Sequence, residues 1–373
     1  MKYYIIAGEP SGDLHASYLM KSIRLQDPEA DFRCWGGDLM ENEGGDIVKH
    51  YKELAFMGFL EVVLNLKTIL SNLAICKTDI LLYEPDVVIL VDYPGFNLKI
   101  AKFAKENNLK VVYYISPQVW AWKKGRVHSI KKYVDRMITI LPFEKEFYAK
   151  YDYEVDYVGH PLLDELPQTT SPDHDSTDFR ATYHLSEKPI VALLPGSRKQ
   201  EINMMLPIML QIPQRFPDYQ FVISGVKWQP ESRYRAILKN KNIPIVYDNH
   251  LLLRHAQAAI VTSGTATLET ALFNVPQVIC YKGNFFSYLI AKWLIKEIKY
   301  ISLVNLVANR RIVTELIQND LTVSNLYAEL NQILHNQKNI NEMKEEYLKL
   351  KELLGGGGAA EKAAEVVKKV VIS

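Results

Sequence analysis

The chain of 373 residues has little cysteine, no long uncharged apolar run and no excess of either charge. Its three cysteines, Cys34, Cys76 and Cys280, are too widely spaced for a disulfide framework or a zinc site, which is typical of a reducing compartment. The 44 basic and 43 acidic residues give a net charge of +1, which argues against a general nucleic-acid-binding protein. No stretch of 18 residues is free of charge, and the first residues lack the regions of a signal peptide. We therefore expect an intracellular protein without a membrane span.

Two segments are nevertheless strongly apolar. Residues 54–70 contain only Glu61 and Lys67 as charged residues, and residues 285–304 combine aromatic and aliphatic side chains with four charged ones. Buried helices would explain both segments. A surface that contacts lipid or an acyl chain would explain them as well.

Strand-like and helix-like stretches alternate along both halves of the chain. Residues 86–92 (DVVILVD) are an almost continuous apolar run, which is typical of a strand buried on both faces of a parallel sheet. The alternation predicts an α/β fold with two Rossmann-like domains. The predicted strands are residues 3–7, 86–92, 110–115, 136–141 and 155–158 in the first half, and 190–194, 220–224, 243–247, 259–262 and 277–281 in the second.

A polar segment rich in Ser, Thr, Asp and Pro separates the two halves. We place a linker at residues 166–188, between an N-terminal domain at 1–165 and a C-terminal domain at 189–354. Four consecutive glycines then interrupt the helical pattern, and a last helix follows them. Residues 355–373 are expected to cross back to the first domain.

A Gly/Ser turn follows the first predicted strand of each half: AGEPSGD at 7–13 and LPGSR at 194–198. A helix that begins after such a turn directs its N–H groups and the positive end of its dipole toward one point, which suits an anion. An arginine in the second turn could add a bidentate contact. An ordinary strand–helix turn would have a similar sequence. The candidate substrate-binding residues of these turns are Ser11, Gly12, Gly196, Ser197, Arg198 and Glu201.

Residues 262–269 (TSGTATLE) form a second strand–helix junction in the C-terminal half. Ser263, Gly264 and Thr265 could hold a diphosphate, and Glu269 could accept hydrogen bonds from ribose hydroxyls. Capping of the helix by Ser263 or Thr265 is the alternative. Two anion sites at neighbouring strand ends indicate a nucleotide diphosphate at the carboxyl edge of the sheet.

Three side chains of the first half are candidate bases. Asp92 ends the predicted strand 86–92, and a carboxylate at that position could take a proton from an attacking hydroxyl. Glu9 and His15, which flank the first glycine turn, compete with it. The sequence alone leaves the choice open.

The next two segments of the first half have two explanations each. Residues 115–122 (ISPQVWAW) could line an apolar or sugar pocket, or pack between helices. Residues 123–136 hold six basic residues and one acidic residue, so they form either a solvated helix face or a surface attracted to an anionic membrane.

We expect no metal site. His250 and His255 do not share a helix face, and Asp173-His174-Asp175 lies inside the polar linker. Without a metal, Arg198 and helix N-termini would have to stabilise the leaving diphosphate.

Together these motifs resemble the lipid-A-disaccharide synthase family, and they follow the family order over nearly the whole chain. The matching segments are AGEPSGDLHA (7–16), MGFLEV (57–62), DYPGFN (92–97), YYISPQVWAW (113–122), VGHPL (158–162), LLPGSRKQE (193–201), SGTATLE (263–269), SLVNLVANRRIVTELIQ (302–318) and LGGGGAAEKAA (354–364).

This resemblance implies a GT-B fold, with two Rossmann-like domains facing a central cleft. It implies an inverting transfer that joins UDP-2,3-diacylglucosamine to 2,3-diacylglucosamine 1-phosphate and gives lipid A disaccharide 1-phosphate and UDP, without metal or cofactor. It also implies a cytoplasmic protein that is peripheral on the inner face of the inner membrane, and a homodimer is compatible with it.

The resemblance assigns roles to the candidate residues. Asp92 would deprotonate the 6-hydroxyl of the acceptor, Arg198 and the Ser197 turn would hold the diphosphate, and Thr265 and Glu269 would hold phosphate and ribose. Asn305, in the SLVNL segment, would make polar contacts to a substrate.

Two other functions fit the same architecture. One is a different GT-B UDP-sugar enzyme, such as a UDP-N-acetylglucosamine transferase or 2-epimerase. The other is a non-catalytic protein that binds a UDP-sugar or a lipid. The segments MGFLEV (57–62) and SPQVWAW (116–122) favour the lipid A enzyme.

Overall fold

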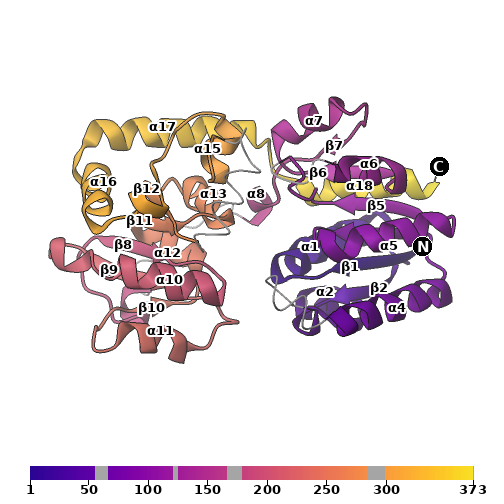
Figure 1. Ribbon diagram of the computed structural model, residues 1–373, viewed down its shortest axis with the longest axis horizontal. Helices are drawn as coiled ribbons and strands as arrows, with labels where there is room; N and C mark the ends of the chain where they lie inside the picture. Colours follow the sequence, from indigo (N-terminus) through magenta and orange to yellow (C-terminus); the bar gives the residue numbers. More distant parts are fainter. Residues whose placement is uncertain (55–65, 121–124, 166–178, 284–298, 373) are drawn as a thin grey trace. The chain divides into compact units, whose positions relative to one another are not determined.

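The computed structural model describes residues 1–54, 66–120, 125–165, 179–283 and 299–372. The chain forms two units, Met1–Leu166 with Leu354–Ser373 and Pro167–Leu353. Each unit, taken by itself, is a parallel sheet with helices on both faces (Figure 1). The predicted α/β class with two Rossmann-like units is therefore confirmed.

The sheet of the first unit has the strand order β3-β2-β1-β4-β5-β6-β7, and every pair of neighbours is parallel among the described strands. The chain first adds strands on one side of β1 and then continues from β4 on the other side. β1 and β4 therefore flank the topological switch point, where α/β sheets bind ligands. The strands are β1 (Lys2–Ala7), β2 (Asp31–Gly36), β3 (Asp46–His50), β4 (Val87–Val91), β5 (Lys110–Tyr114), β6 (Arg136–Thr139) and β7 (Asp156–Tyr157).

Helices cover both faces of this sheet because alternate residues of its strands point to opposite sides. Tyr3 and Ile5 pack under α1 (Pro10–Gln26) and α18 (Ala359–Ile372). Tyr4 and Ile6 pack on the other face, under α4 (Leu66–Tyr83), α5 (Pro94–Glu106) and α6 (Arg126–Tyr133). The shorter helices of the unit are α2 (Asp38–Asn42), η1 (Tyr51–Glu53), α7 (Pro142–Ala149) and α8 (Leu162–Glu165).

The sheet of the second unit repeats this topology with the order β10-β9-β8-β11-β12-β13, and its described neighbours are also parallel. Here the switch point lies between β8 and β11. The strands are β8 (Ile190–Leu194), β9 (Gln220–Ser224), β10 (Ile245–Val246), β11 (Ala256–Thr262), β12 (Gln277–Tyr281) and β13 (Glu315–Ile317).

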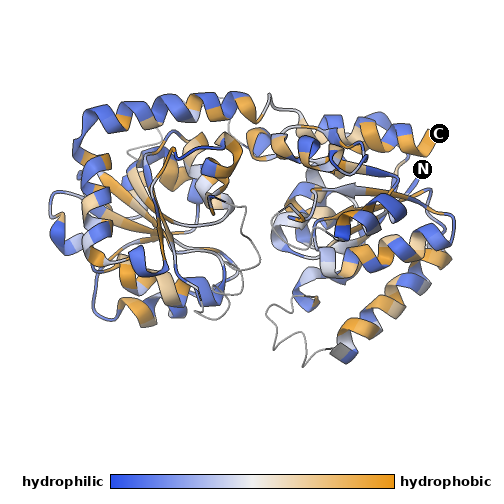
Figure 2. Cartoon of the chain, turned by 45° about the horizontal axis from the view of Figure 1, so that its top comes forward, coloured by the Kyte–Doolittle hydropathy of each residue, from blue (hydrophilic) through white to orange (hydrophobic). Residues whose placement is uncertain are grey.

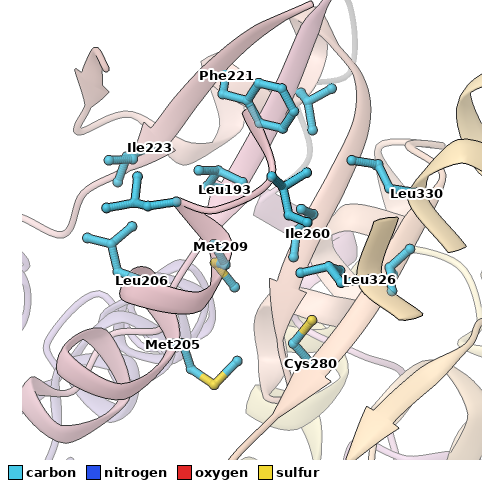
Figure 3. Packing of buried hydrophobic residues seen from close by; sticks show 14 of the residues in the cluster. Leu193, Met205, Leu206, Met209, Phe221, Ile223, Ile260, Cys280, Leu326 and Leu330 are labelled. Carbon is cyan, nitrogen blue, oxygen red and sulfur yellow. The ribbon is translucent and has the colours of Figure 1, made fainter. Parts of the chain in front are cut away.

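The larger core of the second unit lies between its sheet and three helices, α10 (Lys199–Met209), α11 (Glu231–Leu238) and α16 (Val323–His335). Figure 3 shows Leu193, Phe221 and Ile260 of the strands packed with Leu206 and Met209 of α10. The opposite face packs on α12 (Asn249–His255). The remaining helices are η2 (Pro213–Arg215), α13 (Thr265–Leu272), α15 (Leu303–Ala308), η3 (Gln318–Asp320) and α17 (Gln337–Leu353).

All ten predicted strands are present, with differences at their ends, and three of them match residue for residue: 190–194, 220–224 and 277–281. β2, β3 and β13 were not among the strands predicted from the sequence. β2 mixes Asp and Arg with its apolar residues, and β3 and β13 are short edge strands, so none of them shows a continuous apolar run.

The predicted linker extends too far at its C-terminal end. Phe179 is buried in the core of the second unit and stacks on His255, with ring centroids 4.6 Å apart, and Tyr183 packs against the same core. Residues 179–185 therefore belong to the second unit. Residues 166–178 lie outside the described residues.

The strands of both sheets are mostly apolar, whereas many outer helices also carry polar residues (Figure 2). No helix in the described part of the chain is long and apolar enough to span a membrane. Most of the apolar segments predicted at 54–70 and 285–304 fall outside the described residues.

Candidate active site

The carboxyl ends of β1 and β4 bring two of the predicted motifs together in the first unit. The ring of Tyr93, which follows β4, lies directly against Gly8, which follows β1: a Cβ at Gly8 would be only 2.4 Å from Cδ1 of Tyr93. α1 and α5 begin beside this contact, each with a proline in its first turn, and no described side chain caps either N-terminus. This edge therefore presents two helix N-termini at the switch point.

Asp92 stands at this edge on a constrained backbone. Asp92 and Tyr93 both have φ of 46°, a left-handed conformation that non-glycine residues seldom adopt. The Asp92 carbonyl accepts hydrogen bonds from Nδ2 of the buried Asn97, at 2.8 Å, and from the hydroxyl of Tyr113. Two consecutive strained residues held by buried donors are typical of a functional position.

The other candidates of the first unit differ in their surroundings. Glu9 is the N-cap residue of α1. Burial raises the pKa of Tyr93, and the charge of Glu9 adds to this effect. Ser11 is exposed in the first turn, whereas Gly12 is buried and lets α1 approach β1, because a Cβ there would lie 3.3 Å from the Cβ of Ala7.

His15 lies deeper in the first unit. Its Nδ1 is 3.5 Å from Oε1 of Glu165, and burial lowers the His15 pKa to about 4. The nearby His160 is also buried, and its pKa is lowered to about 3 by burial and by His15. The imidazole of His15 is therefore neutral at pH 7 and a weak base.

The described part of the segment 115–122 favours packing over a pocket. Trp120 meets Phe143 edge to face, with ring centroids 4.9 Å apart. The Ser116 hydroxyl is 2.8 Å from the hydroxyl of the buried Tyr148. Glu144, beside them, is buried, and burial raises its pKa to about 7. The second tryptophan of the segment lies outside the described residues.

The turn after β8 in the second unit is shaped by a glycine and a glutamate. Gly196 has φ of +101°, and a Cβ there would lie 2.5 Å from Oε2 of Glu201. That carboxylate oxygen accepts the backbone N–H groups of Ser197, at 3.0 Å, and Arg198, at 3.1 Å. Glu201 thus accepts two of the N–H groups that we expected to bind phosphate, and their contact with phosphate stays a prediction.

The guanidinium of Arg198 remains accessible beside this turn. Its side chain is 59% exposed, and Nη1 is 3.6 Å from Oε1 of Glu201. Trp228, in the loop after β9, is 55% exposed, and its indole N–H donates to the Ser197 carbonyl at 3.2 Å. Trp228 was not predicted from the sequence, although an aromatic residue in the loop after a predicted strand was the signal that could have revealed it.

The junction after β11 leaves a helix N-terminus without a side-chain cap. The N-cap of α13 is Gly264, and a Cβ at this residue would have no neighbouring atom within 4 Å. Thr265 is exposed. Ser263 instead donates its hydroxyl to the Ile301 carbonyl at 3.1 Å. The alternative expectation, that Ser263 or Thr265 caps the helix, is thus wrong, and the N-terminus of α13 suits an anion.

Glu269 lies in the second turn of α13 and has a partner that was not predicted from the sequence. Nε2 of His250, on α12, is 2.7 Å from Oε1 of Glu269. In the sequence, His250 had been a candidate only for metal binding, together with His255. Nothing in the spacing of His250 and Glu269 along the sequence indicates their contact.

Asn305 is fully buried on α15. Its Nδ2 donates to the Val313 carbonyl and to Glu315, both at 2.9 Å, and its Oδ1 accepts the N–H groups of Ile312 and Val313. The amide therefore has no capacity left for the direct substrate contact that we expected. This geometry favours a positioning role for Asn305.

Within the described ranges, no group of three or more His, Cys, Asp or Glu side chains is arranged to hold a metal ion. The first unit thus offers carboxylates at a strained strand end. The second offers an arginine, a helix N-terminus and a paired carboxylate around one switch point. Taken by itself, the second unit suits the binding of a nucleotide diphosphate, and the first unit suits a base that accepts a proton from a hydroxyl.

A family model described as lipid-A-disaccharide synthetase matches residues 3–370. The chain belongs to this family. A lipid-A-disaccharide synthase of Syntrophus aciditrophicus is 39% identical over 371 residues, with 96% of this chain and 95% of the relative covered. A lipid-A-disaccharide synthase of Coxiella burnetii (strain RSA 331) is 37% identical over 373 residues, with 99% of this chain and 98% of the relative covered. The chain is therefore a hexosyltransferase of lipid A biosynthesis.

Solved structures with low identity share the fold of the chain. A structure of S. aureus MnaA with UDP has a TM-score of 0.67 at 15% identity and covers 100% of this chain and 97% of its own. The calicheamicin glycosyltransferase CalG4 has a TM-score of 0.59 at 15% identity, and the match covers 99% of this chain and 98% of the CalG4 chain. These matches support the GT-B fold and carry no argument about substrate.

Proposed function

We propose that the second unit binds the UDP part of UDP-2,3-diacylglucosamine and that Asp92 of the first unit activates 2,3-diacylglucosamine 1-phosphate. The observation that carries the proposal is that Asp92 and Glu9 lie at the topological switch point of the first unit, and that Arg198 and the N-terminus of α13 lie at that of the second. The chain matches its family over residues 3–370. The products are UDP and lipid A disaccharide 1-phosphate.

On the donor side, the uncapped N-terminus of α13 and the exposed guanidinium of Arg198 supply positive charge for the diphosphate. Ser263, Gly264 and Thr265 lie at that N-terminus. Glu269 accepts from the ribose hydroxyls. Glu201 acts differently from our first expectation: it holds the turn of Gly196 and keeps Arg198 in place.

On the acceptor side, Asp92 takes the proton of the 6-hydroxyl while its oxygen attacks C1 of the donor. The C1–oxygen bond to the diphosphate breaks, the configuration at C1 inverts, and UDP leaves with the bonding electrons. Glu9, with Ser11 and Gly12 in the next turn, lies beside the same strand ends and is the second candidate base. His15 ranks third, because its lowered pKa makes it a weak proton acceptor.

The test is turnover with both diacylated substrates in detergent, followed by mass spectrometry. Asp92→Asn should lower kcat by about 10²- to 10⁴-fold and leave UDP affinity unchanged. Asp86→Asn is the matched control, because Asp86 precedes the same strand at its opposite end and its carboxylate accepts the Lys2 N–H. Near wild-type turnover of a folded Asp92→Asn protein would show that Asp92 is not the base. Glu9 would then be the candidate base, and turnover of Glu9→Gln would test it.

We also propose that the first unit associates with the inner face of the inner membrane. α4 exposes the apolar side chains of Leu70, Ile75, Leu81 and Leu82. α6 exposes two lysines and packs on the same face of the sheet, with α5 between it and α4. Exposed apolar residues beside basic ones suit an anionic lipid surface.

Flotation with vesicles tests this association. Phosphatidylglycerol vesicles should retain the protein and phosphatidylcholine vesicles should not. Leu82→Ser and the pair Lys131→Glu and Lys132→Glu should release it. The pair Lys368→Glu and Lys369→Glu, on α18 at the opposite face of the sheet, is the control. Sedimentation as a dimer that Leu82→Ser dissociates, without binding to vesicles, would assign the α4 surface to a homodimer instead.

A further inference from the structure

The Glu269 carboxylate has a protein partner on one of its two oxygens. Nε2 of His250 lies 2.7 Å from Oε1 of Glu269, and the two side chains are 31% and 16% exposed. Nε2 of an imidazole donates to a carboxylate oxygen at this distance when the ring is protonated and when it is the neutral Nε2–H tautomer. A carboxylate engaged in this way can still accept hydrogen bonds through its other oxygen. The pair is therefore compatible with a ligand at Glu269.

His250 is itself held by its surroundings. Asp248 caps α12 by accepting the Leu251 N–H at 2.9 Å. The neighbouring Asn249 accepts the hydroxyl of Ser224, at the end of β9, also at 2.9 Å. The imidazole contacts the ring of Phe273, with centroids 5.2 Å apart. These contacts fix the backbone of His250 and one side of its ring, so the imidazole can set the direction of the Glu269 carboxylate.

We propose that His250 is a positioning residue for the donor nucleotide. It orients Glu269 so that the second carboxylate oxygen faces the ribose hydroxyls of the UDP-sugar. The inference rests on the proposed function, which places the ribose at Glu269. It adds a residue that lies outside all the segments matching the family pattern. An orienting partner of this kind commonly sets how strongly a carboxylate can bind its ligand.

A purely structural tie between α12 and α13 would have a different signature. Loss of such a tie would weaken the binding of any nucleotide equally, or only lower the stability of the unit. Loss of an orienting contact should affect only ligands that have ribose hydroxyls. The discrimination between UDP and 2′,3′-dideoxy-UDP separates the two roles.

The experiment is calorimetric titration of both nucleotides into the full chain. His250→Phe should raise the Kd of UDP about tenfold and leave that of 2′,3′-dideoxy-UDP within twofold. His250→Gln, whose amide keeps an N–H donor near the position of Nε2, should recover most of the affinity. His335→Phe is the matched control, because His335 lies on α16 and bonds only to Tyr219 and Asn331 among the described residues. In turnover, the donor KM should rise while kcat stays within twofold.

The outcomes separate this inference from the proposed function. An unchanged ratio of the two affinities in folded His250→Phe, or equal weakening of both nucleotides, would overturn the positioning role alone. Equal affinity of the wild-type protein for the two nucleotides would show that the ribose does not bind at Glu269, and the positioning role of His250 would be contradicted as well. The proposed synthesis of the disaccharide would not be affected. A wild-type protein that does not bind UDP would contradict the proposed donor site itself.

Discussion

The carboxylate of Asp164 accepts the N–H of Gly358 at 2.6 Å, although the two residues are 194 positions apart. The same carboxylate accepts the N–H groups of Ala359, at 2.9 Å, and Ala360, at 3.2 Å. These are the first N–H groups of α18, so a side chain of α8 caps a helix at the far end of the chain. Because α18 packs in the core under the first sheet, this cap helps to fix the last residues of the chain to the first unit.

We predict that Asp164→Ala lowers the free energy of unfolding of the first unit by about 2 kcal/mol, since it removes a three-bond cap and a negative charge from the helix N-terminus. Asp164→Asn should cost about half as much. Urea unfolding measures both. Glu361→Ala, an exposed change in the same first turn, is the control. An unfolding free energy of Asp164→Ala equal to that of the wild type would show that the cap does not contribute.

A second prediction concerns the turn of Gly196. A methyl group at this residue would meet Glu201, and the alanine backbone would have to keep a φ of +101°. Gly196→Ala should therefore displace the Glu201 carboxylate and destabilise the second unit by about 1–3 kcal/mol. Since Arg198 pairs with that carboxylate, UDP affinity should also fall at least tenfold. Gly264→Ala is the matched control for stability, because Gly264 is extended and has open space around it. Equal melting temperatures of the two variants would contradict this reasoning.

Buried titratable groups give the first unit a defined pH dependence. The pKa values of His15 and His160 are lowered from 6.5 to about 4 and about 3 by burial, so the unfolded chain binds two more protons than the folded one between pH 4 and 6.5. Their contribution to stability is complete above pH 6.5 and is lost as the pH falls. The pKa of Glu144 is raised from 4.5 to about 7, so between these values the folded state holds one extra proton. This contribution has the opposite sign.

Between pH 4.5 and 6.5 the unfolded state thus binds one net proton more. We predict that the stability of the first unit rises with pH by about 1.4 kcal/mol per unit in this window. Glu144→Gln should roughly double the slope, and His160→Gln should bring it close to zero. Urea unfolding at a series of pH values measures the slopes. Parallel curves for the wild type and Glu144→Gln would show that Glu144 does not titrate in this range.

The central part of the fold could be predicted because buried parallel strands are continuous apolar runs. Residues 86–92 and 190–194 show this pattern, and their chain order led to two Rossmann-like units. β3 lies at the edge of its sheet and carries charged residues, so its pairing with β2 depends on contacts that no local pattern encodes. The placement of the candidate residues at one edge could be predicted from topology, because all carboxyl ends of a parallel sheet meet there.

The partners of the site residues could not be predicted in the same way. The hydrogen bond from the Ser197 N–H to Glu201 depends on the rotamer of the Glu201 side chain, which lies against the left-handed Gly196. The contact of His250 with Glu269 joins two helices that follow different strands. Such pairings arise from the packing of the whole unit, and the spacing of the residues along the sequence does not indicate them.

The last prediction uses the exposed indole of Trp228 as a reporter. Trp228 lies beside the Arg198 turn, and its N–H binds the Ser197 carbonyl, so a diphosphate bound at Arg198 should bring negative charge close to the ring. The emission of an exposed indole responds to such a change, whereas Trp35 is fully buried in the other unit. We predict that UDP changes the tryptophan fluorescence and that Trp228→Phe removes most of the change without altering the calorimetric Kd more than threefold. Retention of the full signal in Trp228→Phe would place the diphosphate away from the Ser197–Arg198 turn.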